Sequence, residues 1–252
     1  MGNRREYLID AIVEVCRLVY DKGWVANHDG NVTVRYEGTL LATPTAVSKN
    51  DIVPETVITL DMEGNKLQGI GKPFSEVKLH LAAYRTREDA QAVVHAHPPF
   101  AMARGLVGRD FEIVVPEAIV SIGDVIPVAM YALPGAKEND DIVTRALSTC
   151  DVFMMAGNGV LAIGRDVKEA FLRIELLEHL LKIDYYAKSM GTVMSIPGED
   201  RQKLLEKRAS LGLGPKGVKT PPVQTQQVVQ PTMNQADLIK DLIAQELKQL
   251  IK

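Results

Sequence analysis

Long apolar runs, charge of a single sign and cysteine are all scarce in this sequence. No segment approaches the roughly 20 apolar residues that a membrane-spanning helix needs. The opening residues, MGNRREYLID, lack the apolar centre of a signal peptide, and no Ser or Thr stands at position 6 of the myristoylation pattern. The formal net charge is -3, which gives no broad attraction to nucleic acid. We therefore expect a cytoplasmic protein that binds neither a membrane nor nucleic acid.

The two cysteines lack the CxxC spacing of a redox pair or a zinc site. Cys16 lies on the apolar face of an expected helix, and Cys150 precedes an apolar segment. We predict two reduced thiols that pack in the core.

Apolar periodicity predicts helices and short strands along the chain. Helical spacing indicates a helix over residues 5–22, and a capping box that begins at Asp166 opens a long helix to about residue 190. Ser75 is a candidate N-cap for a helix over residues 76–85. Short strands between these helices indicate an α/β or α+β architecture. Strands are expected at residues 32–36, 39–43, 57–61, 92–96, 112–115, 125–131, 152–156 and 160–163.

The composition changes after about Leu213, which divides the chain into three predicted parts. Residues 1–213 carry the periodic segments and form the expected main domain. Residues 214–233 are rich in Pro, Gln and Gly, which is typical of a flexible linker. Residues 234–252 place Leu and Ile on one face of a helix that is marginal alone in water. This segment favours either docking on its own domain or a neighbouring subunit, or a role as a partner-binding tag.

The segment VVHAHPP carries the strongest chemical signal. Positions i and i+2 of a strand point to the same face, so His95 and His97 present two imidazoles side by side. Two neutral imidazoles form half of a typical transition-metal site. Hydrogen-bonded histidines without a metal are the structural alternative, but a close pair at a strand end favours metal binding.

Other candidate residues lie outside this motif. Glu76 is in the first turn of an expected helix, where a carboxylate either complements the helix dipole or serves as a metal-directed group or general base. His80, one turn further on, is interpreted as structural. The turn before Asn31 and the loop around Thr45 can offer donors to an anion, although ordinary turns are the simpler interpretation. Asn158-Gly159 is typical of a tight hairpin turn.

Several segments stand in an order and spacing that resemble one family, the class II aldolase and adducin family, over about residues 5–190. These segments are GNVTVR at 30–35, LLATPT at 40–45, KPFSEVKLHLAAYR at 72–85, AVVHAHPP at 92–99, PEAIVSIGDVIPVAMYALPG at 116–135 and NGVLAIG at 158–164. The resemblance implies an α/β fold with a central, mainly antiparallel sheet flanked by helices. It also implies a homotetramer with sites between subunits, and it identifies residues 1–213 as an aldolase-like catalytic domain.

The resemblance implies a metal-dependent aldolase as well. In that family Zn²⁺ is held by the histidines of the HAH motif, here His95 and His97, and Glu76 occupies the position of the acid/base. Retro-aldol cleavage leaves negative charge on an enediolate, which a dication stabilises while a carboxylate shuttles the proton.

The substrate implied by the resemblance is a sugar phosphate. Asn31, Thr45 and Ser75 match family positions around the substrate phosphate. L-fuculose 1-phosphate or rhamnulose 1-phosphate would be cleaved to dihydroxyacetone phosphate and lactaldehyde.

Three positions depart from the family pattern. Asn158 stands where the family usually has its third zinc-binding histidine, and an amide oxygen is a weaker ligand for Zn²⁺ than imidazole. Phe74 and Ala46 replace a common serine and a common glycine near the phosphate. Because Asn158 is a poor ligand, we expect Glu76 to stay on the metal with the two histidines, a set that also suits Fe²⁺ or Mn²⁺.

The terminal segments resemble the encapsulation peptides that tether enzymes to bacterial microcompartment shells. This similarity implies a shell protein as the partner of residues 234–252 and favours fuculose or rhamnulose phosphate as substrate. Two alternatives stay open: an epimerase, decarboxylase or oxygenase on the same fold, or a non-catalytic adducin-like assembly module with a decayed metal site. Asn158 favours the second alternative, whereas the retained histidine pair and Glu76 argue against it.

Overall fold

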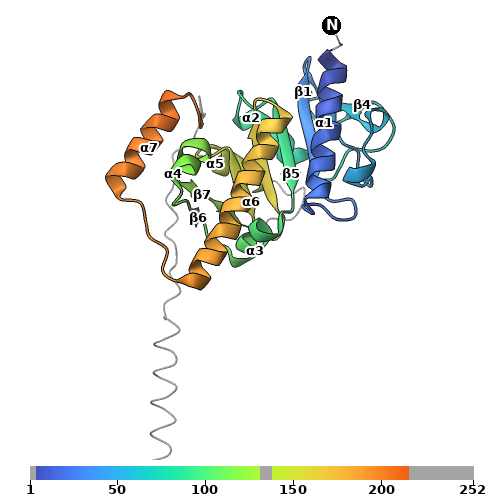
Figure 1. Ribbon diagram of the computed structural model, residues 1–252. Coiled ribbons are helices and arrows are strands. Elements are labelled where there is room, and N and C mark those ends of the chain that lie inside the picture. Colours follow the sequence, from blue (N-terminus) through green and yellow to red (C-terminus); the bar gives the residue numbers. More distant parts are fainter. Residues whose placement is uncertain (1–3, 131–137, 216–252) are drawn as a thin grey trace, which may run out of the picture. The chain divides into compact units, whose positions relative to one another are not determined.

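The computed structural model describes residues 4–130 and 138–215, whose helices pack around one large sheet (Figure 1). No helix within these ranges is both long and apolar enough to cross a membrane. The helices are α1 (Arg4–Asp21), α2 (Val77–Thr86), α3 (Pro99–Val107), α4 (Pro116–Ile122), α5 (Glu138–Leu147), α6 (Val167–Met190) and α7 (Gly198–Ser210), with the 3-10 turns η1 (Lys49–Asp51) and η2 (Pro54–Thr56).

The sheet has the order β4-β3-β2-β1-β5-β10-β9-β8, and every neighbouring pair is antiparallel except β8 with β9. The predicted mainly antiparallel sheet is therefore confirmed. β6 and β7 form a separate two-stranded ribbon. The strands are β1 (Asn31–Tyr36), β2 (Thr39–Ala42), β3 (Ile58–Leu60), β4 (Lys66–Gln68), β5 (Ala92–Ala96), β6 (Phe111–Glu112), β7 (Val125–Ile126), β8 (Val128–Ala129), β9 (Val152–Met155) and β10 (Val160–Gly164).

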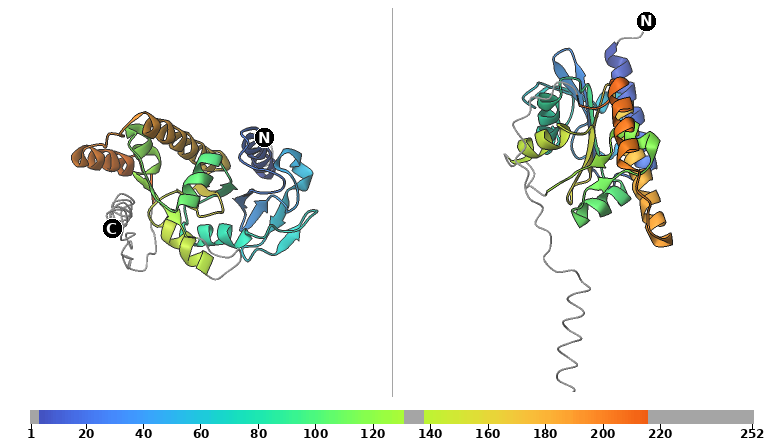
Figure 2. Two further views of the ribbon diagram at one scale, coloured as in Figure 1. Left: turned by 90° about the horizontal axis from the view of Figure 1, so that it is seen from below. Right: turned by 90° about the vertical axis from the view of Figure 1, so that its left-hand side faces the viewer.

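Side-chain alternation divides the core between the two faces of the sheet. Val94 and Ala96 belong to the apolar cluster that includes α1 and α6, whereas Val93 belongs to a second cluster with α2 and α5. Figure 2 shows helices on both sides of the strands. Because both faces are covered, the central strands are buried at nearly every position and their sequences are continuous apolar runs.

Both cysteines lie in this core, as predicted. Cys16 is buried in α1, and Cys150 is buried just before β9. Burial raises the pKa of each thiol to about 12, so both stay protonated at neutral pH.

The structure corrects the limits of two predicted elements. α2 begins at Val77 with Glu76 as its N-cap residue, so the predicted cap, Ser75, lies outside the helix and Glu76 is at its edge. The strand predicted over residues 125–131 is interrupted at Pro127, which has no N–H for a strand ladder, and it splits into β7 and β8.

Several short elements were not predicted. α3 and α4 each open on a proline, Pro99 and Pro116, and proline in the first helical turn is the signal that could have indicated them. β4 is exposed along its length, and the strand expected near residues 112–115 is reduced to β6. α7 is strongly polar, and Arg208 is its buried residue, so apolar periodicity could not indicate it.

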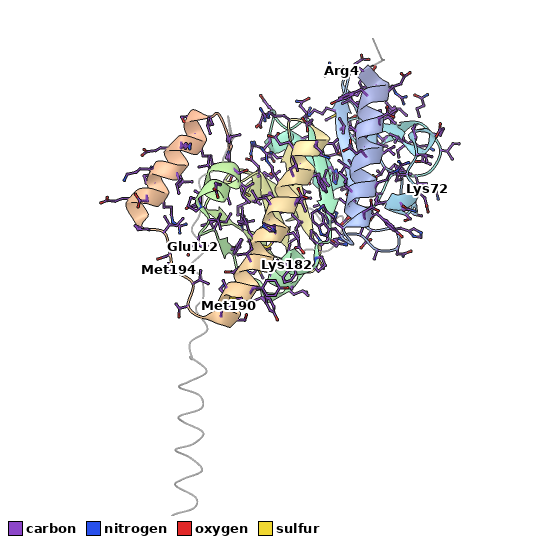
Figure 3. The ribbon with its side chains drawn as sticks, in the orientation of Figure 1. Arg4, Lys72, Glu112, Lys182, Met190 and Met194 are labelled. Atoms are coloured by element: carbon purple, nitrogen blue, oxygen red, sulfur yellow. The ribbon has the colours of Figure 1, made fainter. Side chains whose placement is uncertain are left out.

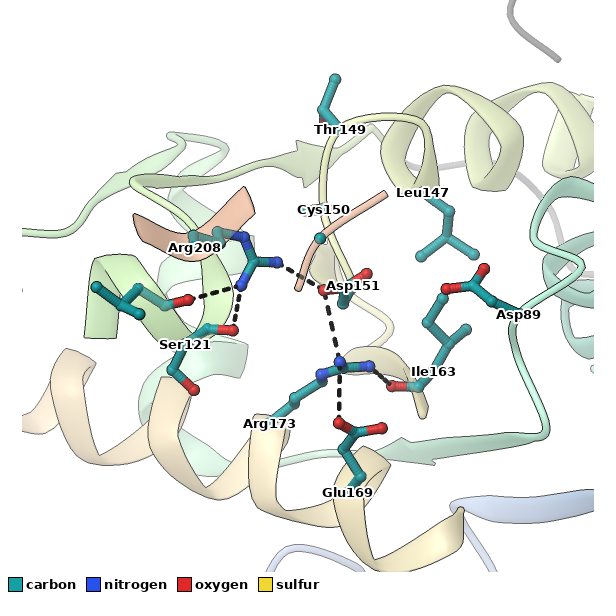
Figure 4. A network of polar contacts seen from close by, with 12 residues as sticks. Asp89, Ser121, Leu147, Thr149, Cys150, Asp151, Ile163, Glu169, Arg173 and Arg208 are labelled. Carbon is teal, nitrogen blue, oxygen red and sulfur yellow. Dashed lines mark hydrogen bonds and ion pairs between the residues drawn. The ribbon is translucent and has the colours of Figure 1, made fainter. Parts of the chain in front are cut away.

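A buried group of charged side chains attaches α7 to the domain (Figure 4). Asp151, just before β9, is 0% exposed and lies 2.8 Å from Arg87 and 2.6 Å from Arg208 of α7. Arg173 of α6 approaches the same carboxylate at 3.6 Å. Arg208 also donates to two backbone carbonyl groups near the end of α4. The docking of α7 therefore combines one buried negative charge with the partly buried Leu204 and Leu205, which pack against the core.

α6 ends at Met190, and an exposed stretch that includes Met194 leads to α7 (Figure 3). The described residues end at Pro215, just after the predicted boundary at Leu213. The rest of the predicted linker and the predicted helix over residues 234–252 lie outside the described residues and stay predictions.

Candidate active site

The residues singled out in the sequence meet at one end of the central strands. β1 pairs with β5 so that Asn31 lies opposite His95, and β5 pairs with β10 so that His95 lies opposite Leu161. Directly paired residues of antiparallel strands point to the same face, which here is the face that carries α2. Glu76, at the start of α2, and Asn158, in the turn between β9 and β10, both contact His95.

His95 is buried, and each of its ring nitrogens faces an acceptor. Nε2 lies 2.7 Å from the backbone carbonyl of Asn158, so this nitrogen carries a proton and donates it. Nδ1 lies 3.0 Å from Oε2 of Glu76, outside hydrogen-bonding geometry. With Nδ1 unprotonated, two acceptor atoms face each other, an arrangement that needs a shared proton or a shared cation.

His97 presents its other ring nitrogen to the site. Its Nδ1 donates to Oδ2 of Asp29 at 2.7 Å, which leaves the lone pair on Nε2. Within the described residues this Nε2 is buried and has no hydrogen-bond partner. Burial and the nearby His95 lower the pKa of His97, so its ring is neutral at pH 7. The two imidazole centroids lie 4.9 Å apart, so the HAH motif brings the rings together as predicted.

Gly159 allows the close approach of His97 to the β9–β10 turn. A Cβ at this position would lie 2.2 Å from Cδ2 of His97 and 2.3 Å from the carbonyl oxygen of Ala96. Its φ of 77° also belongs to the left-handed region that favours glycine. Asn158-Gly159 is thus part of a tight turn, as predicted. The ring of His97 leaves no room for a side chain at position 159.

Two asparagines hold the carboxylate of Glu76. Nδ2 of Asn31 donates to Oε2 at 3.0 Å, and Nδ2 of Asn158 donates to Oε1 at 2.6 Å. Burial favours a raised pKa for this carboxyl, but the charge of His95 and the two amide donors outweigh burial and hold the pKa of Glu76 well below its usual range. Glu76 in turn outweighs the effect of burial on His95 and raises the pKa of that ring.

These side chains offer metal donors in two pairs. Within residues 4–130 and 138–215, no three His, Cys, Asp or Glu side chains already converge on one point, because His95 lies against Glu76 and His97 lies against Asp29. Two ligands of one first-row dication are about 3.0–3.5 Å apart, since each metal–ligand bond is about 2.0–2.2 Å long. The Nδ1–Oε2 pair has this separation, at 3.0 Å. Together with the free Nε2 of His97, the set fits a divalent transition metal.

Asp29 is a site residue that the sequence does not single out. It lies in the segment ANHDGN, which is interpreted above as an ordinary turn. Its carboxylate accepts from the His97 ring and from the backbone N–H of Ala26. A metal-binding histidine commonly gives its second ring N–H to a carboxylate. A loop aspartate such as Asp29 is therefore a candidate partner for a histidine of the HAH motif.

A family model accounts for this arrangement. The model described as the class II aldolase and adducin N-terminal domain matches residues 10–185. The chain belongs to this family. The predicted resemblance and the predicted fold are therefore confirmed.

Individual relatives within the family are aldolases by name. An L-fuculose phosphate aldolase of Methanococcus maripaludis is 28% identical over 179 residues, which cover 71% of this chain and 96% of that protein. A 5-deoxy-D-ribulose 1-phosphate aldolase of Bacillus thuringiensis is 28% identical over 205 residues, which cover 81% and 96%. A solved structure of L-fuculose 1-phosphate aldolase matches with a TM-score of 0.74 at 25% identity, covering 82% of this chain and 97% of that chain. The predicted enzyme class, an aldehyde-lyase, is confirmed.

Two of the departures from the family pattern have a structural outcome here. The side chain of Asn158 turns to Glu76, where it acts as a hydrogen-bond donor. Phe74 is buried and packs edge-on against His80, with ring centroids 5.0 Å apart, so it belongs to the core. His80 is itself fully buried, in agreement with its structural interpretation.

Hydrogen bonds link the segments that carry the positions implied by the family for phosphate binding, because Thr45 contacts Lys72 and Asn31 contacts Glu76. Thr45 and Ser75 are exposed, and the N–H of Thr45 donates to the carbonyl of Lys72, which is labelled in Figure 3. In the part of the chain that the structure describes, neither hydroxyl is hydrogen-bonded to Glu76. Asn31, the third such position, is buried, and its Nδ2 donates to Glu76.

Ala46 takes the place of the family's glycine in a left-handed backbone conformation, with φ at 60°. A side chain there costs about 1–2 kcal/mol, and the greater freedom of glycine in the unfolded chain offsets about 0.5–1 kcal/mol of that. We expect Ala46→Gly to raise the free energy of unfolding by about 0.5–1 kcal/mol, measured by urea denaturation. Ala187→Gly, inside α6, is the matched control and should lower it by about 1 kcal/mol. Equal losses in both variants would contradict strain at Ala46.

Proposed function

We propose that the protein is a metal-dependent class II aldolase that cleaves a phosphorylated ketose. One observation carries the proposal: among the described residues, Nδ1 of His95 and Nε2 of His97 are buried without a hydrogen-bond partner, in neighbouring rings, and Nδ1 lies beside the carboxylate of Glu76. Relatives named for L-fuculose phosphate and 5-deoxy-D-ribulose 1-phosphate support the substrate class. L-fuculose 1-phosphate is our first candidate and rhamnulose 1-phosphate the second, and each would give dihydroxyacetone phosphate and lactaldehyde.

In this proposal Nδ1 of His95, Nε2 of His97 and the carboxylate of Glu76 hold the metal. When bound, a dication stabilises the negative charge of the enediolate that cleavage of the carbon–carbon bond leaves behind. We propose Zn²⁺ first, and the two-His, one-carboxylate set also suits Mn²⁺ or Fe²⁺. Asn158 contributes a hydrogen bond to Glu76 and no ligand.

Glu76 is also the proposed group for proton transfer. Retro-aldol cleavage removes a proton from a substrate hydroxyl and returns one to carbon. A carboxyl with a lowered pKa is ionised at neutral pH, so Glu76 can first take the proton of the substrate hydroxyl and then return that proton to carbon. Asn31, Thr45 and Ser75 are proposed to bind the substrate phosphate, and Thr45 and Ser75 are exposed at the protein surface.

The deciding experiment is metal analysis of the purified full chain, followed by an aldehyde-release screen on ketose 1-phosphates. We expect about one metal ion per chain, lost in His95→Ala, and release of aldehyde from at least one substrate. Bound metal without aldehyde release would favour an epimerase, decarboxylase or oxygenase on the same fold. No metal in the wild type, with binding regained in Asn158→His, would favour a non-catalytic adducin-like module.

The pairing of Asp29 with His97 predicts a second effect on the metal. Asp29→Asn keeps the size of the side chain but removes the charge that fixes the His97 proton on Nδ1. We expect the affinity for Zn²⁺ to fall by about 10- to 100-fold in titrations of metal-free protein against a chelator. Asp51→Asn, an exposed position in η1, is the control and should bind as the wild type does. Unchanged affinity in Asp29→Asn would show that His97 needs no partner.

The assembly of the chain is a separate proposal. The family resemblance supports a homotetramer, and the pattern of residues 234–252 supports a tether to a microcompartment shell protein in the cytoplasm. Deletion of residues 234–252 should leave cleavage unchanged and abolish co-purification with shell protein. A deletion that changes the mass in light scattering would indicate instead that this segment holds subunits together.

A further inference from the structure

Glu178 of α6 holds the start of the helix that follows the HAH motif. Its Oε1 accepts from the backbone N–H of Phe100 at 3.0 Å, and its Oε2 accepts from that of Ala101 at 2.9 Å. Glu178 is 8% exposed, and α6 packs against α3 (Figure 1). The sequence does not single out this carboxylate, because it stands among the leucines of a long helix.

α3 has no cap of its own. The first N–H groups of a helix have no partner within the helix, and a Ser, Thr, Asp or Asn just before it usually supplies one. Here Pro98 is the N-cap residue, without a side-chain hydrogen bond, and Pro99 has no N–H to donate. A carboxylate from α6 therefore takes the place of the local cap, and its charge complements the positive end of the α3 dipole.

This carboxylate would be costly to bury without α3. Burial is the largest influence on Glu178 and raises its pKa, whereas the two backbone N–H groups and Lys182 lower it. Both oxygens accept a hydrogen bond, as those of an ionised carboxylate do. The start of α3 thus stabilises the charge of Glu178, and Glu178 in turn fixes the start of α3.

Two prolines connect this fixed point to His97. Proline holds its own φ at about −65° and restricts the residue before it, so His97-Pro98-Pro99 is a stiff connection. The N–H of His97 donates to the carbonyl of Trp24 at 2.7 Å, which fixes the backbone on the other side. The ring already lies too close to Gly159 for a Cβ there, so His97 has no room to move toward that turn. A shift of α3 would therefore change the position of the His97 ring.

We propose that Glu178 is a positioning residue for His97. By fixing the start of α3, it holds the imidazole where Nδ1 meets Asp29 and where Nε2 keeps its lone pair for the site. A bond from imidazole to Zn²⁺ is about 2.0–2.1 Å long, so a small displacement of the ring weakens it. That Nε2 binds a metal rests on the proposed function, whereas the effect of Glu178 on the His97 ring does not.

The His97 ring can be observed in the metal-free full chain without any substrate. In protein labelled with ¹⁵N-histidine, the resonances of His97 are those missing from His97→Gln protein. At neutral pH we expect one neutral form in the wild type, with its proton on Nδ1, and a mixture of the two neutral forms in Glu178→Gln protein. His80, buried in α2, is the internal reference. Identical His97 resonances in both proteins would overturn the proposal.

The affinity for Zn²⁺ then tests the consequence for the site. Metal-free protein is titrated with Zn²⁺ against a chelator, under conditions in which circular dichroism shows each variant to be folded. We expect Glu178→Gln to weaken binding by about 10-fold, because its NH₂ group would face one of the two N–H donors. Asp184→Asn removes an ion pair with Lys188 within α6 and is the matched control, which should bind as the wild type does.

Urea denaturation of the same variants separates positioning from stability alone. Loss of a helix cap lowers the urea midpoint whatever the cap does for His97. A lowered midpoint with wild-type affinity for Zn²⁺ would make Glu178 a structural residue and would overturn the proposal. Should Glu178→Gln fail to fold, Glu178→Asp decides, because it keeps the charge but is too short to reach both N–H groups. Wild-type affinity in that variant would overturn the proposal as well.

Failure of the proposed function would give a different result. A wild-type chain that binds no Zn²⁺ would contradict the metal site, and the His97 resonances would still decide the role of Glu178. Equal binding of Zn²⁺ by the wild type and by Glu178→Gln protein would leave the metal site in place and would remove Glu178 from its support.

Discussion

Glu76→Gln should lower kcat for ketose phosphate cleavage by about 10²- to 10⁴-fold, the range for loss of a general acid or base. The amide keeps the size of the side chain and removes the atom that carries the proton. It also turns one acceptor oxygen into an NH₂ donor. This donor would face the N–H donor of Asn31 or of Asn158. The rate is measured as aldehyde release at saturating substrate.

Metal content, measured on the same preparation, distinguishes the two proposed roles of Glu76, as a metal ligand and as the proton-transfer group. Loss of metal together with kcat would make the carboxylate a ligand, whereas loss of kcat alone would make it the proton-transfer group. Glu55→Gln changes an exposed carboxylate in η2 and should retain full activity. Full activity in Glu76→Gln protein would remove this residue from the chemistry.

Asp151→Asn should lower the free energy of unfolding by about 3–5 kcal/mol. It leaves the buried guanidinium group of Arg208 without its negative partner, whereas Arg87 keeps Asp89. Arg208 relies on this carboxylate and on backbone carbonyl groups, and Arg87 is almost fully buried beside it. The amide would also direct an N–H group at one of these cations. Urea denaturation followed by the fluorescence of Trp24, the single tryptophan, measures the loss.

A surface ion pair provides the comparison for Asp151. Asp200→Asn removes a carboxylate that is exposed and pairs with Lys203 in α7. Its effect should stay below about 1 kcal/mol, because such pairs contribute little in water. A similarly small effect in Asp151→Asn would show that backbone carbonyl groups are enough to hold Arg208, and that α7 docks without the buried charge.

Local rules were sufficient to predict the histidine pair. His95 is in β5 and His97 comes directly after its last residue, and strand alternation that continues for this one residue brings the two rings together. The family resemblance assigned Glu76 and Asn31 to one site, although they are 45 residues apart in the sequence. The phosphate-binding role of Asn31 stays a prediction, and the structure adds that its amide donates to the carboxylate of Glu76 on another element.

Other parts of the site depend on contacts that no local pattern encodes. Asp29 and His97 are 68 residues apart, and only the folded chain brings the carboxylate to Nδ1. Asn158 is a turn residue by sequence, and the direction of its side chain is set by Glu76. α7 was missed for a related reason, since a polar helix that docks through Arg208 has no apolar stripe to indicate it.

The turn between β9 and β10 places a replaceable residue directly before one that cannot change. Gly159 has no room for even a methyl group, so the backbone of this turn is constrained whatever stands beside it. The side chain of Asn158, by contrast, reaches into the site from a partly exposed position. A saturation library at codon 158 would therefore vary the chemical character of the site on an unchanged backbone. Metal preference in this scaffold is then open to laboratory evolution through a single residue.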